Sequence, residues 1–423
     1  MARSVPQAAK SPPWHTAAML HALHRLSLIA WIGIALVAGV LAGFVLPEAA
    51  LPVAAAVGDI VLRALQMLIL PIVVTTVIVG INQSGPAALG RTGAALAAYY
   101  VVTTAVAMII GLAAALVFSP GDGLSLPTSG PASPPAHPGP AALVASIVPT
   151  NIVAAFADLN MLAVLFVAIV FGVAIALARY ETSDSTDGVA ALYQGIRGLE
   201  TITLRVMRWV LAVLPIGIFA IVAHTVAAQG SDALISLARL IGVFYLGLAG
   251  QLVFYGLLLL AAGAGVARFV HGARSATLTA FATQSSTGTL PVTLAAAERL
   301  GVARAIRGTA LPLGATINMD GAALRIAVSA VFAANIVGMD LGMGELAAIV
   351  GVGTLISIGT AGVPGAGIVM IATVFAQVGL PLQAVALLSA IDALVGMGAT
   401  AVNVTGDLVG ATLIQRLSER RRS

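Results

Sequence analysis

Residues 314–321, Gly314-Ala315-Thr316-Ile317-Asn318-Met319-Asp320-Gly321, lie inside an apolar run at 309–337. A run of this length predicts a membrane span. An ionisable side chain at bilayer depth costs about 2.5–3.5 kcal/mol on insertion scales, so Asp320 should have a partner or a function. The flanking glycines predict a break in the helix here. A broken helix frees backbone carbonyls, and free carbonyls beside a carboxylate can form a cation site.

The composition predicts a polytopic helical membrane protein. Of the 423 residues, 60% are hydrophobic and 9% are charged, whereas soluble domains carry about 25% charged residues. The net charge of +4 does not indicate nucleic-acid binding, because the basic residues cluster at the chain ends and in short loops, as membrane orientation requires. The absence of cysteine excludes disulfides, thiolate metal sites and cysteine nucleophiles.

The expected fold is an all-α membrane protein with eight transmembrane helices and two re-entrant helical hairpins, arranged as inverted repeats. The second span is expected at about 53–81, several short helices at 142–178 and a loop at 179–190. Residues 119–141 hold seven prolines and no Lys or Arg, which predicts an extended extracellular linker. Residues 1–25 and 416–423 are expected to be cytoplasmic tails of a cell-membrane protein. The first span is expected to act as an uncleaved signal anchor.

One unit occurs twice in the last third of the chain. Residues 275–295 are rich in Ser and Thr and contain Gly288 and Pro291, whereas residues 357–367 contain four glycines and Pro364. Neither segment suits an unbroken spanning helix. Each is followed by a span with polar residues at mid-depth, at about 309–337 and 382–415. Duplicated, interrupted segments of this kind point to the binding site of a transporter.

The last span carries a polar stripe. Its members recur at intervals of 4, 3, 4 and 4 residues and therefore share one helical face: Asp392, Gly396, Ala399, Asn403 and Asp407. An Asn and an Asp one turn apart suit a hard cation, which prefers oxygen ligands. Asn318 and Asp320 offer the same chemistry. The alternative is that these side chains only hold helices together, as Asn does in membrane bundles.

Three other features have two interpretations each. The hydroxyls of residues 285–289, at the start of a half-helix, predict an anion site or else a polar loop that lines water. Tyr100, Thr103 and Thr104 supply oxygens to a cation or serve in ordinary helix packing. Arg325 holds a substrate carboxylate, or it forms a structural ion pair with Asp392 or Asp407.

Four motifs resemble the dicarboxylate/amino acid:cation symporter family, the glutamate transporter homologues. They are Ser285-Ser286-Thr287-Gly288-Thr289-Leu290-Pro291-Val292-Thr293, Leu311-Pro312-Leu313-Gly314-Ala315-Thr316-Ile317-Asn318-Met319-Asp320-Gly321, Gly359-Thr360-Ala361-Gly362-Val363-Pro364-Gly365-Ala366-Gly367 and Asn403-Val404-Thr405-Gly406-Asp407. These motifs are long and specific, and the similar span pattern extends from about residue 26 to the end.

The resemblance implies a homotrimer that works as an elevator. A scaffold of residues 26–92 and 142–230 would make the trimer contacts. A transport domain of residues 93–118 and 231–415 would move across the membrane, and residues 343–377 would form the gate. The lipid bilayer and a small organic anion are the other expected partners, and nucleic acid is not expected.

The resemblance also implies three sites for co-transported Na⁺. One would use Asn403, Asp407, Asn318 and the Gly314 carbonyl. A second, under the gate, would use Thr316, Ser357, Ile358 and Thr360. A third would use Tyr100, Thr103, Thr104, Asn318 and Asp320.

The substrate site departs from the family pattern. The expected substrate-binding residues are Gln284, Ser285, Ser286, Arg325, Val363, Gly367, Thr400 and Asn403. Relatives that carry acidic amino acids have an Asp for the amino group and an Arg for the side-chain carboxylate where this chain has Gly396 and Ala399. A dicarboxylate is expected if Arg325 binds substrate, and a more apolar monocarboxylate if it does not.

We therefore predict a sodium-coupled symporter of small organic anions, dicarboxylate or amino acid, that is not an enzyme. An uncoupled anion channel or a non-transporting ligand sensor on the same fold is the alternative. An intramembrane hydrolase is disfavoured, because the histidine nearest to the serine motif is His271, in a predicted loop.

Overall fold

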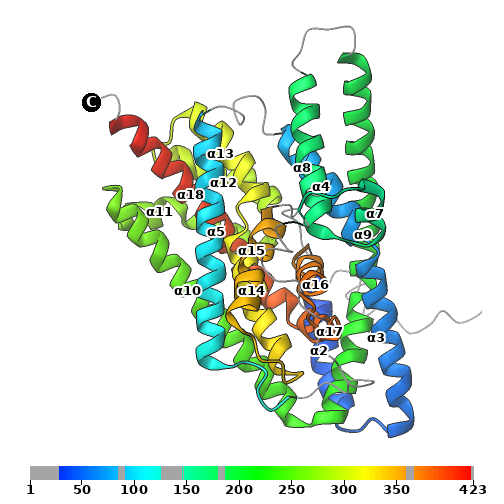
Figure 1. Ribbon diagram of the computed structural model, residues 1–423. Helices are drawn as coiled ribbons and strands as arrows, with labels where there is room; N and C mark the ends of the chain where they lie inside the picture. The colour runs from blue at the N-terminus through cyan, green and yellow to red at the C-terminus, as the bar shows by residue number, and fades with distance from the viewer. Residues whose placement is uncertain are drawn as a thin grey trace, which may run out of the picture.

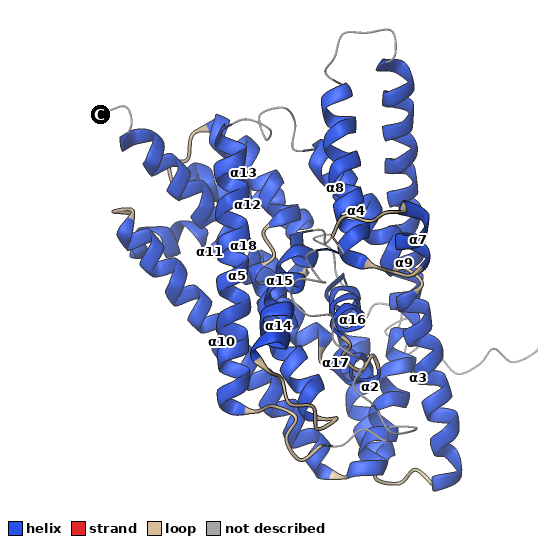
Figure 2. Ribbon diagram, in the orientation of Figure 1, coloured by secondary structure: helices blue, strands red, loops and turns tan. Residues whose placement is uncertain are grey.

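The computed structural model describes residues 28–83, 91–124, 145, 147–179, 186–358 and 366–420. All regular secondary structure in these residues is helical, with no strand among them, which confirms the all-α class (Figure 2). Five helical segments of the described chain are long and apolar enough to cross a membrane: Gly93–Phe118, Asp187–Ala228, Leu234–Ala261, Arg304–Asn335 and Asp392–Arg420. Shorter apolar helices accompany them, so the count of eight spans stays a prediction.

The first group of helices packs around the longest helix, α9 (Thr186–Gln229), on the right of Figure 1. Glycines let the backbones come close: a Cβ at Gly43 would meet Val226, and one at Gly58 would meet Ile221. The other members of the group are α2 (Leu28–Gly43), η1 (Glu48–Ala50), α3 (Leu51–Gln66), α4 (Ile69–Gln83), α7 (Ile152–Ala157) and α8 (Met161–Ala178).

Three boundaries in this group bear on the predictions. The predicted span at 53–81 is two helices, because the ring of Pro71 clashes with the carbonyl of a continuous helix four residues earlier, at Met67. The region 142–178 does form short helices, and the Asn160 side chain caps α8 by accepting from Ala163 N at 3.3 Å. The predicted loop at 179–190 is too long, since α9 already begins at Thr186.

The second group holds the polar motifs and lies on the left of Figure 1. Here α14 packs against α5, and α18 packs against α11, α13 and α14. Every residue of α14 from Asp320 to Ala334 is buried. The members are α5 (Arg91–Phe118), α10 (Ser231–Ala261), α11 (Val266–Thr283), α12 (Ser286–Arg299), α13 (Arg304–Ile317), α14 (Asp320–Asn335) and α18 (Asp392–Arg420).

Between the groups lie α15 (Met343–Ile358), α16 (Ala366–Val378) and α17 (Gln383–Ala390). Helix α16 contacts α3, α4 and α8 of the first group, and α14 and α18 of the second. It therefore touches both packing units.

The predicted interruptions occur where the polar motifs lie. Helix α11 ends before Gln284, whose φ of 52° is left-handed, and Ser285 caps α12 by accepting from Gly288 N at 3.0 Å. Helix α13 ends at Ile317 and α14 begins at Asp320, so the expected break at 318–319 is confirmed. The centre of the second predicted hairpin, residues 359–365, lies outside the described residues.

Candidate cation and substrate site

The break between α13 and α14 places the Asn318 side chain at the centre of the second group. Its Nδ2 donates to the Asn403 carbonyl at 3.0 Å and to Asp407 Oδ1 at 2.9 Å. Its Oδ1 is buried and has no hydrogen-bond partner in the described part of the chain. A buried acceptor without a partner costs about 1–3 kcal/mol. This oxygen, beside the Asp407 carboxylate, is therefore suited to contact a cation.

Gly314 completes this cluster through its backbone. Its carbonyl accepts from Asn318 N at 2.9 Å, and a Cβ at position 314 would collide with Asp407 Oδ1 and with the Tyr100 hydroxyl. Tyr100 in turn donates to the Ala310 carbonyl at 2.9 Å. Only glycine leaves room for the carboxylate and the phenol to approach the α13 backbone together. The structure thus brings Gly314, Asn318, Asn403 and Asp407 into one cluster.

A second carboxylate lies beside the first cluster. Asp320 Oδ1 accepts from Thr104 Oγ1 at 2.6 Å, and Oδ2 accepts from Tyr255 Oη at 2.5 Å and from Gln251 Nε2 at 3.2 Å. Asp320 and Thr104 are 0% exposed. Three donors directed at one buried carboxylate provide the stabilisation that a charge needs in a medium of low dielectric constant.

The other predicted oxygen ligands are helical residues whose hydroxyls donate within their own helix. Thr103 donates to the Tyr100 carbonyl at 3.2 Å, Thr316 to that of Leu313 at 2.9 Å, and Ser357 to that of Thr354 at 2.8 Å. Helix α13, which ends at Ile317, packs against helix α15, which ends at Ile358.

Two further predicted residues, Thr360 and Val363, lie outside the described residues. Their parts in the second predicted Na⁺ site and in the substrate site therefore remain predictions.

The tip of the α11–α12 hairpin faces the polar stripe of α18. A Cβ at Gly396 would lie 2.8 Å from Gln284 Oε1, so the missing side chain makes room for this glutamine. Gln284 Nε2 is buried and has no hydrogen-bond partner among the described residues. Ser286, the first residue of α12, is also buried. The tip therefore offers a free amide donor beside a helix N-terminus, an arrangement that favours an anion.

Asn403 and Thr400 are fixed by bonds to the backbone. Asn403 Oδ1 accepts from Gly321 N at 2.7 Å, and Thr400 Oγ1 donates to the Gly396 carbonyl at 2.8 Å. Asn403 therefore ties α18 to the start of α14, next to the cation cluster. A Cβ at Gly321 would collide with the Ala399 backbone, which explains how the two helices come so close.

Arg325 forms an ion pair with Asp392. Its Nη2 lies 2.6 Å from Asp392 Oδ1, and the two side chains are 6% and 7% exposed. A Cβ at Gly367, in the first turn of α16, would collide with the guanidinium. Of the two roles that the sequence left open, the structure contains the ion pair, with Asp392 and not Asp407 as the partner. The pair links α14 to α18, and α16 packs against both helices.

This helical architecture, with a break at 284–285, a break at 318–319 and a buried oxygen cluster, can be compared with known families. The model of the sodium:dicarboxylate symporter family matches residues 28–417. The chain belongs to this family. As a member of the sodium:dicarboxylate symporter family it is a multi-pass cation-coupled symporter of small organic anions and not an enzyme. Family membership also favours symport over the alternative of a channel or a sensor.

Relatives within the family differ in the substrates that their names state. The proton/sodium-glutamate symport protein of Bacillus subtilis (strain 168) is 29% identical over 409 residues, 93% of each chain. The C4-dicarboxylate transport protein of Solibacter usitatus is 30% identical over 403 residues, 93% of this chain and 92% of that protein. The neutral amino acid transporter B(0) of Mus musculus is 32% identical over 418 residues, 86% of this chain and 74% of that protein.

Sequence reasoning missed two partners of the buried Asp320 carboxylate. Gln251 and Tyr255 of α10 both donate to Asp320. They lie one helical turn apart in the second half of a mostly apolar span, which is the signal that could have found them. Nothing local to α10 indicates that this face meets Asp320, because the contact spans more than sixty residues of sequence.

Proposed function

We propose that this protein uses a Na⁺ gradient to drive uptake of a small organic anion. The observation that carries the proposal is the buried, unpartnered Oδ1 of Asn318 beside the Asp407 carboxylate. A cation at this point would gain one charged oxygen, the amide oxygen and nearby backbone carbonyls. Such oxygen ligands suit a hard metal cation. They support Na⁺, although the names of relatives include both proton and sodium coupling.

The two carboxylates would have different roles. Asp320 already accepts three hydrogen bonds from Thr104, Gln251 and Tyr255. Asp407 accepts one from a side chain, Asn318, within the described residues. We therefore assign Asp407 as a direct ligand of Na⁺ and Asp320 as a fixed negative charge that attracts the cation into the transport helices. Thr103, Thr104 and Tyr100 would support a second cation near Asp320.

The substrate would bind between the tip of the α11–α12 hairpin and α18. Ser285, Ser286 and the N-terminus of α12 would hold a carboxylate, with Thr400 and Asn403 opposite. Gly396 and Ala399 supply no charged group for an amino group or a second carboxylate. Because the charge of Arg325 is balanced by Asp392, we favour a substrate with one carboxylate and an uncharged remainder.

The two packing units support a proposal for the assembly and the motion. The first group, α2–α4 and α7–α9, would be the scaffold of a homotrimer. The second group, with α15–α17, would be the part that carries the anion across the cell membrane, and residues 343–377 would form its gate. Basic residues at the ends of α12 and α18 and at the start of α13 favour a cytoplasmic position for that end and for both termini.

The test is uptake by the purified full chain in liposomes under an inward Na⁺ gradient, with an inward K⁺ gradient as the control. Labelled succinate, aspartate and lactate distinguish dicarboxylate, amino acid and monocarboxylate transport. Na⁺-dependent lactate uptake supports the assignment, and succinate uptake would assign a substrate role to Arg325. Uptake of any of the three that is equal in Na⁺ and K⁺ would refute sodium coupling.

A further inference from the structure

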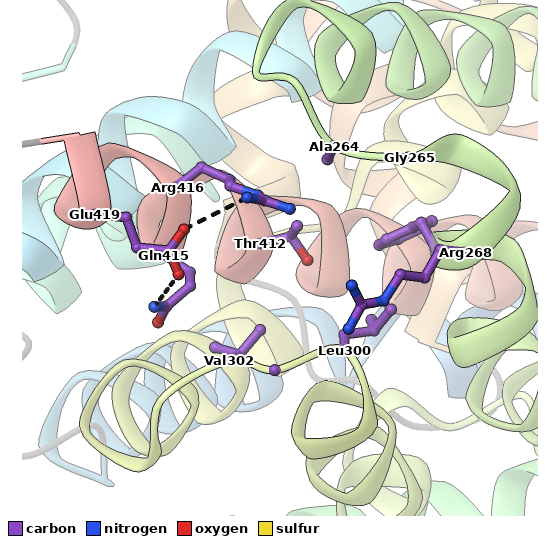
Figure 3. A pocket seen from close by; sticks show the side chains of 11 residues that line it. Ala264, Gly265, Arg268, Leu300, Val302, Thr412, Gln415, Arg416 and Glu419 are labelled. Atoms are coloured by element: carbon purple, nitrogen blue, oxygen red, sulfur yellow. Dashed lines mark hydrogen bonds and ion pairs between the residues drawn. The ribbon is translucent and has the colours of Figure 1, made fainter.

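A polar pocket lies at the end of the second group where the C-terminus is found, away from the cation cluster. It is a cavity of about 230 Å³ between the α10–α11 turn, the α12–α13 turn and the last two turns of α18 (Figure 3). Its walls include Gly265 of the α10–α11 turn, Arg268 of α11, Gly301 and Val302 of the α12–α13 turn, and Arg416 of α18. A single water occupies about 30 Å³ in the liquid, so the pocket has room for a group much larger than water.

Two arginines supply the pocket with positive charge. The guanidinium of Arg268 stands on the wall opposite Arg416 (Figure 3), and it has no hydrogen bond or ion pair within the described residues. Arg416 lies 3.5 Å from Glu419, and their side chains are 42% and 51% exposed. An exposed pair of this kind is weak. The lining therefore keeps an excess of one positive charge, carried by groups that are available to an anion.

The backbone adds donors on the same side as Arg268. Helix α11 begins at Val266, and its N-cap, Gly265, has no side chain that could satisfy the first amides. Such an N-terminus attracts anions through its free N–H groups and its dipole. Across the pocket, Gln415 Oε1 accepts from Ala303 N at 3.0 Å and holds the start of α13 against α18. This hydrogen bond joins the α12–α13 turn to α18 along one wall of the pocket.

The pocket lies at the basic end of the helices. Arg299, Arg304 and Arg307 flank the α12–α13 turn that forms one of its walls. The opposite end is acidic: residues 119–124 and 336–345 contain Asp122, Asp340 and Glu345 and no Lys or Arg. The two acidic segments lie close together there, since Asn335, directly before the second segment, donates from Nδ2 to the Pro120 carbonyl at 2.9 Å. This asymmetry puts the pocket at the leaflet that carries anionic lipids.

We propose that this pocket binds a phosphate group, carried either by the headgroup of an anionic lipid or by a soluble phosphate. Two guanidinium groups and a helix N-terminus form the donor set that phosphate oxygens require. A phosphate held by Arg268 and Arg416 would bridge the α11–α12 hairpin and α18. These are the two elements whose polar faces meet at Gln284 and Gly396. Occupancy would therefore restrain the hairpin and alter the rate of transport.

The test uses the full chain in phosphatidylcholine nanodiscs, with short-chain phosphatidylglycerol and inorganic phosphate as separate probes. Binding is measured by native mass spectrometry for the lipid and by thermal shift for phosphate. Each arginine near an anionic headgroup contributes about fivefold in affinity, so Arg268→Gln and Arg416→Gln should each weaken binding by about that factor. The matched control is Arg274→Gln, which removes the same charge from an exposed position on the same helix.

The two probes separate the two sources of phosphate. Arginine-dependent binding of phosphatidylglycerol alone indicates a lipid site, and arginine-dependent binding of both probes indicates a site open to soluble phosphates. The proposal is overturned if neither probe binds, or if Arg268→Gln and Arg416→Gln change binding no more than Arg274→Gln does.

Discussion

Arg325 Nη2 lies 2.6 Å from Asp392 Oδ1, and both side chains are almost completely buried. The two residues are 67 positions apart, on α14 and α18. Their charges cancel at a depth where either alone would be unfavourable. This pair differs from the cation cluster, where the Asp407 carboxylate is met by an amide and not by a positive side chain.

Breaking the Arg325–Asp392 pair on one side should destabilise the protein. Arg325→Gln or Asp392→Asn alone leaves a buried unpaired charge, which costs about 3–5 kcal/mol. The double variant should regain much of that loss because no charge remains. Thermal unfolding followed by tryptophan fluorescence measures all three. Additive losses in the double variant would contradict a direct pairing, and a stable Arg325→Gln protein that no longer binds anion would point to substrate contact.

Asp407→Asn should weaken Na⁺-driven uptake. Loss of the charged ligand should raise the Na⁺ concentration for half-maximal uptake by about 10–100-fold, the range found when groups around a bound metal are removed. The control is Asp340→Asn, which removes the same charge from an exposed loop. Normal Na⁺ dependence in Asp407→Asn would show that the cation binds elsewhere.

Gly314→Ala should damage the same site without removing any ligand. The added methyl would collide with Asp407 Oδ1 and with the Tyr100 hydroxyl, and overpacking of this kind costs about 1–3 kcal/mol. We expect weaker Na⁺ binding in a thermal-shift titration. Gly308→Ala on the same helix is the matched control, since a Cβ there meets nothing within 4 Å. Equal Na⁺ affinity in the two variants would contradict the geometry.

Tyr255→Phe should weaken Na⁺ coupling through Asp320. A hydrogen bond to a charged group contributes about 1.5–3 kcal/mol, so removal of the hydroxyl leaves the carboxylate less well stabilised. We expect the Na⁺ affinity, measured from uptake curves, to change by about tenfold, which corresponds to about 1.4 kcal/mol. Tyr193→Phe, at another buried tyrosine, on α9, controls for the loss of a tyrosine hydroxyl. A Tyr255→Phe protein with unchanged Na⁺ dependence would remove Asp320 from the cation mechanism.

Local sequence was sufficient to predict two of the helix breaks, because a break depends on residues close to it in the chain. The interruptions at 284–285 and 318–319 could be predicted because Gly, Pro, Ser and polar side chains disfavour a continuous apolar helix at those points. The break at Met67 was missed, since a single proline in an apolar run is compatible with a kinked span as well as with two helices. The predicted loop at 179–190 overlaps the start of α9 at Thr186, because the charged residues in this stretch are typical of a loop.

The sequence by itself determined that this is a helical membrane protein, that its helices break at 284–285 and at 318–319, and which oxygen-bearing side chains lie within apolar runs. These properties follow from hydropathy and from backbone chemistry, which act over a few residues. Only the tertiary structure decided that Arg325 pairs with Asp392, that Gln251 and Tyr255 donate to Asp320, and that Asn318 reaches Asp407. Partners of this kind are selected through space, because packing of distant helices sets the distances on which hydrogen bonds and ion pairs depend.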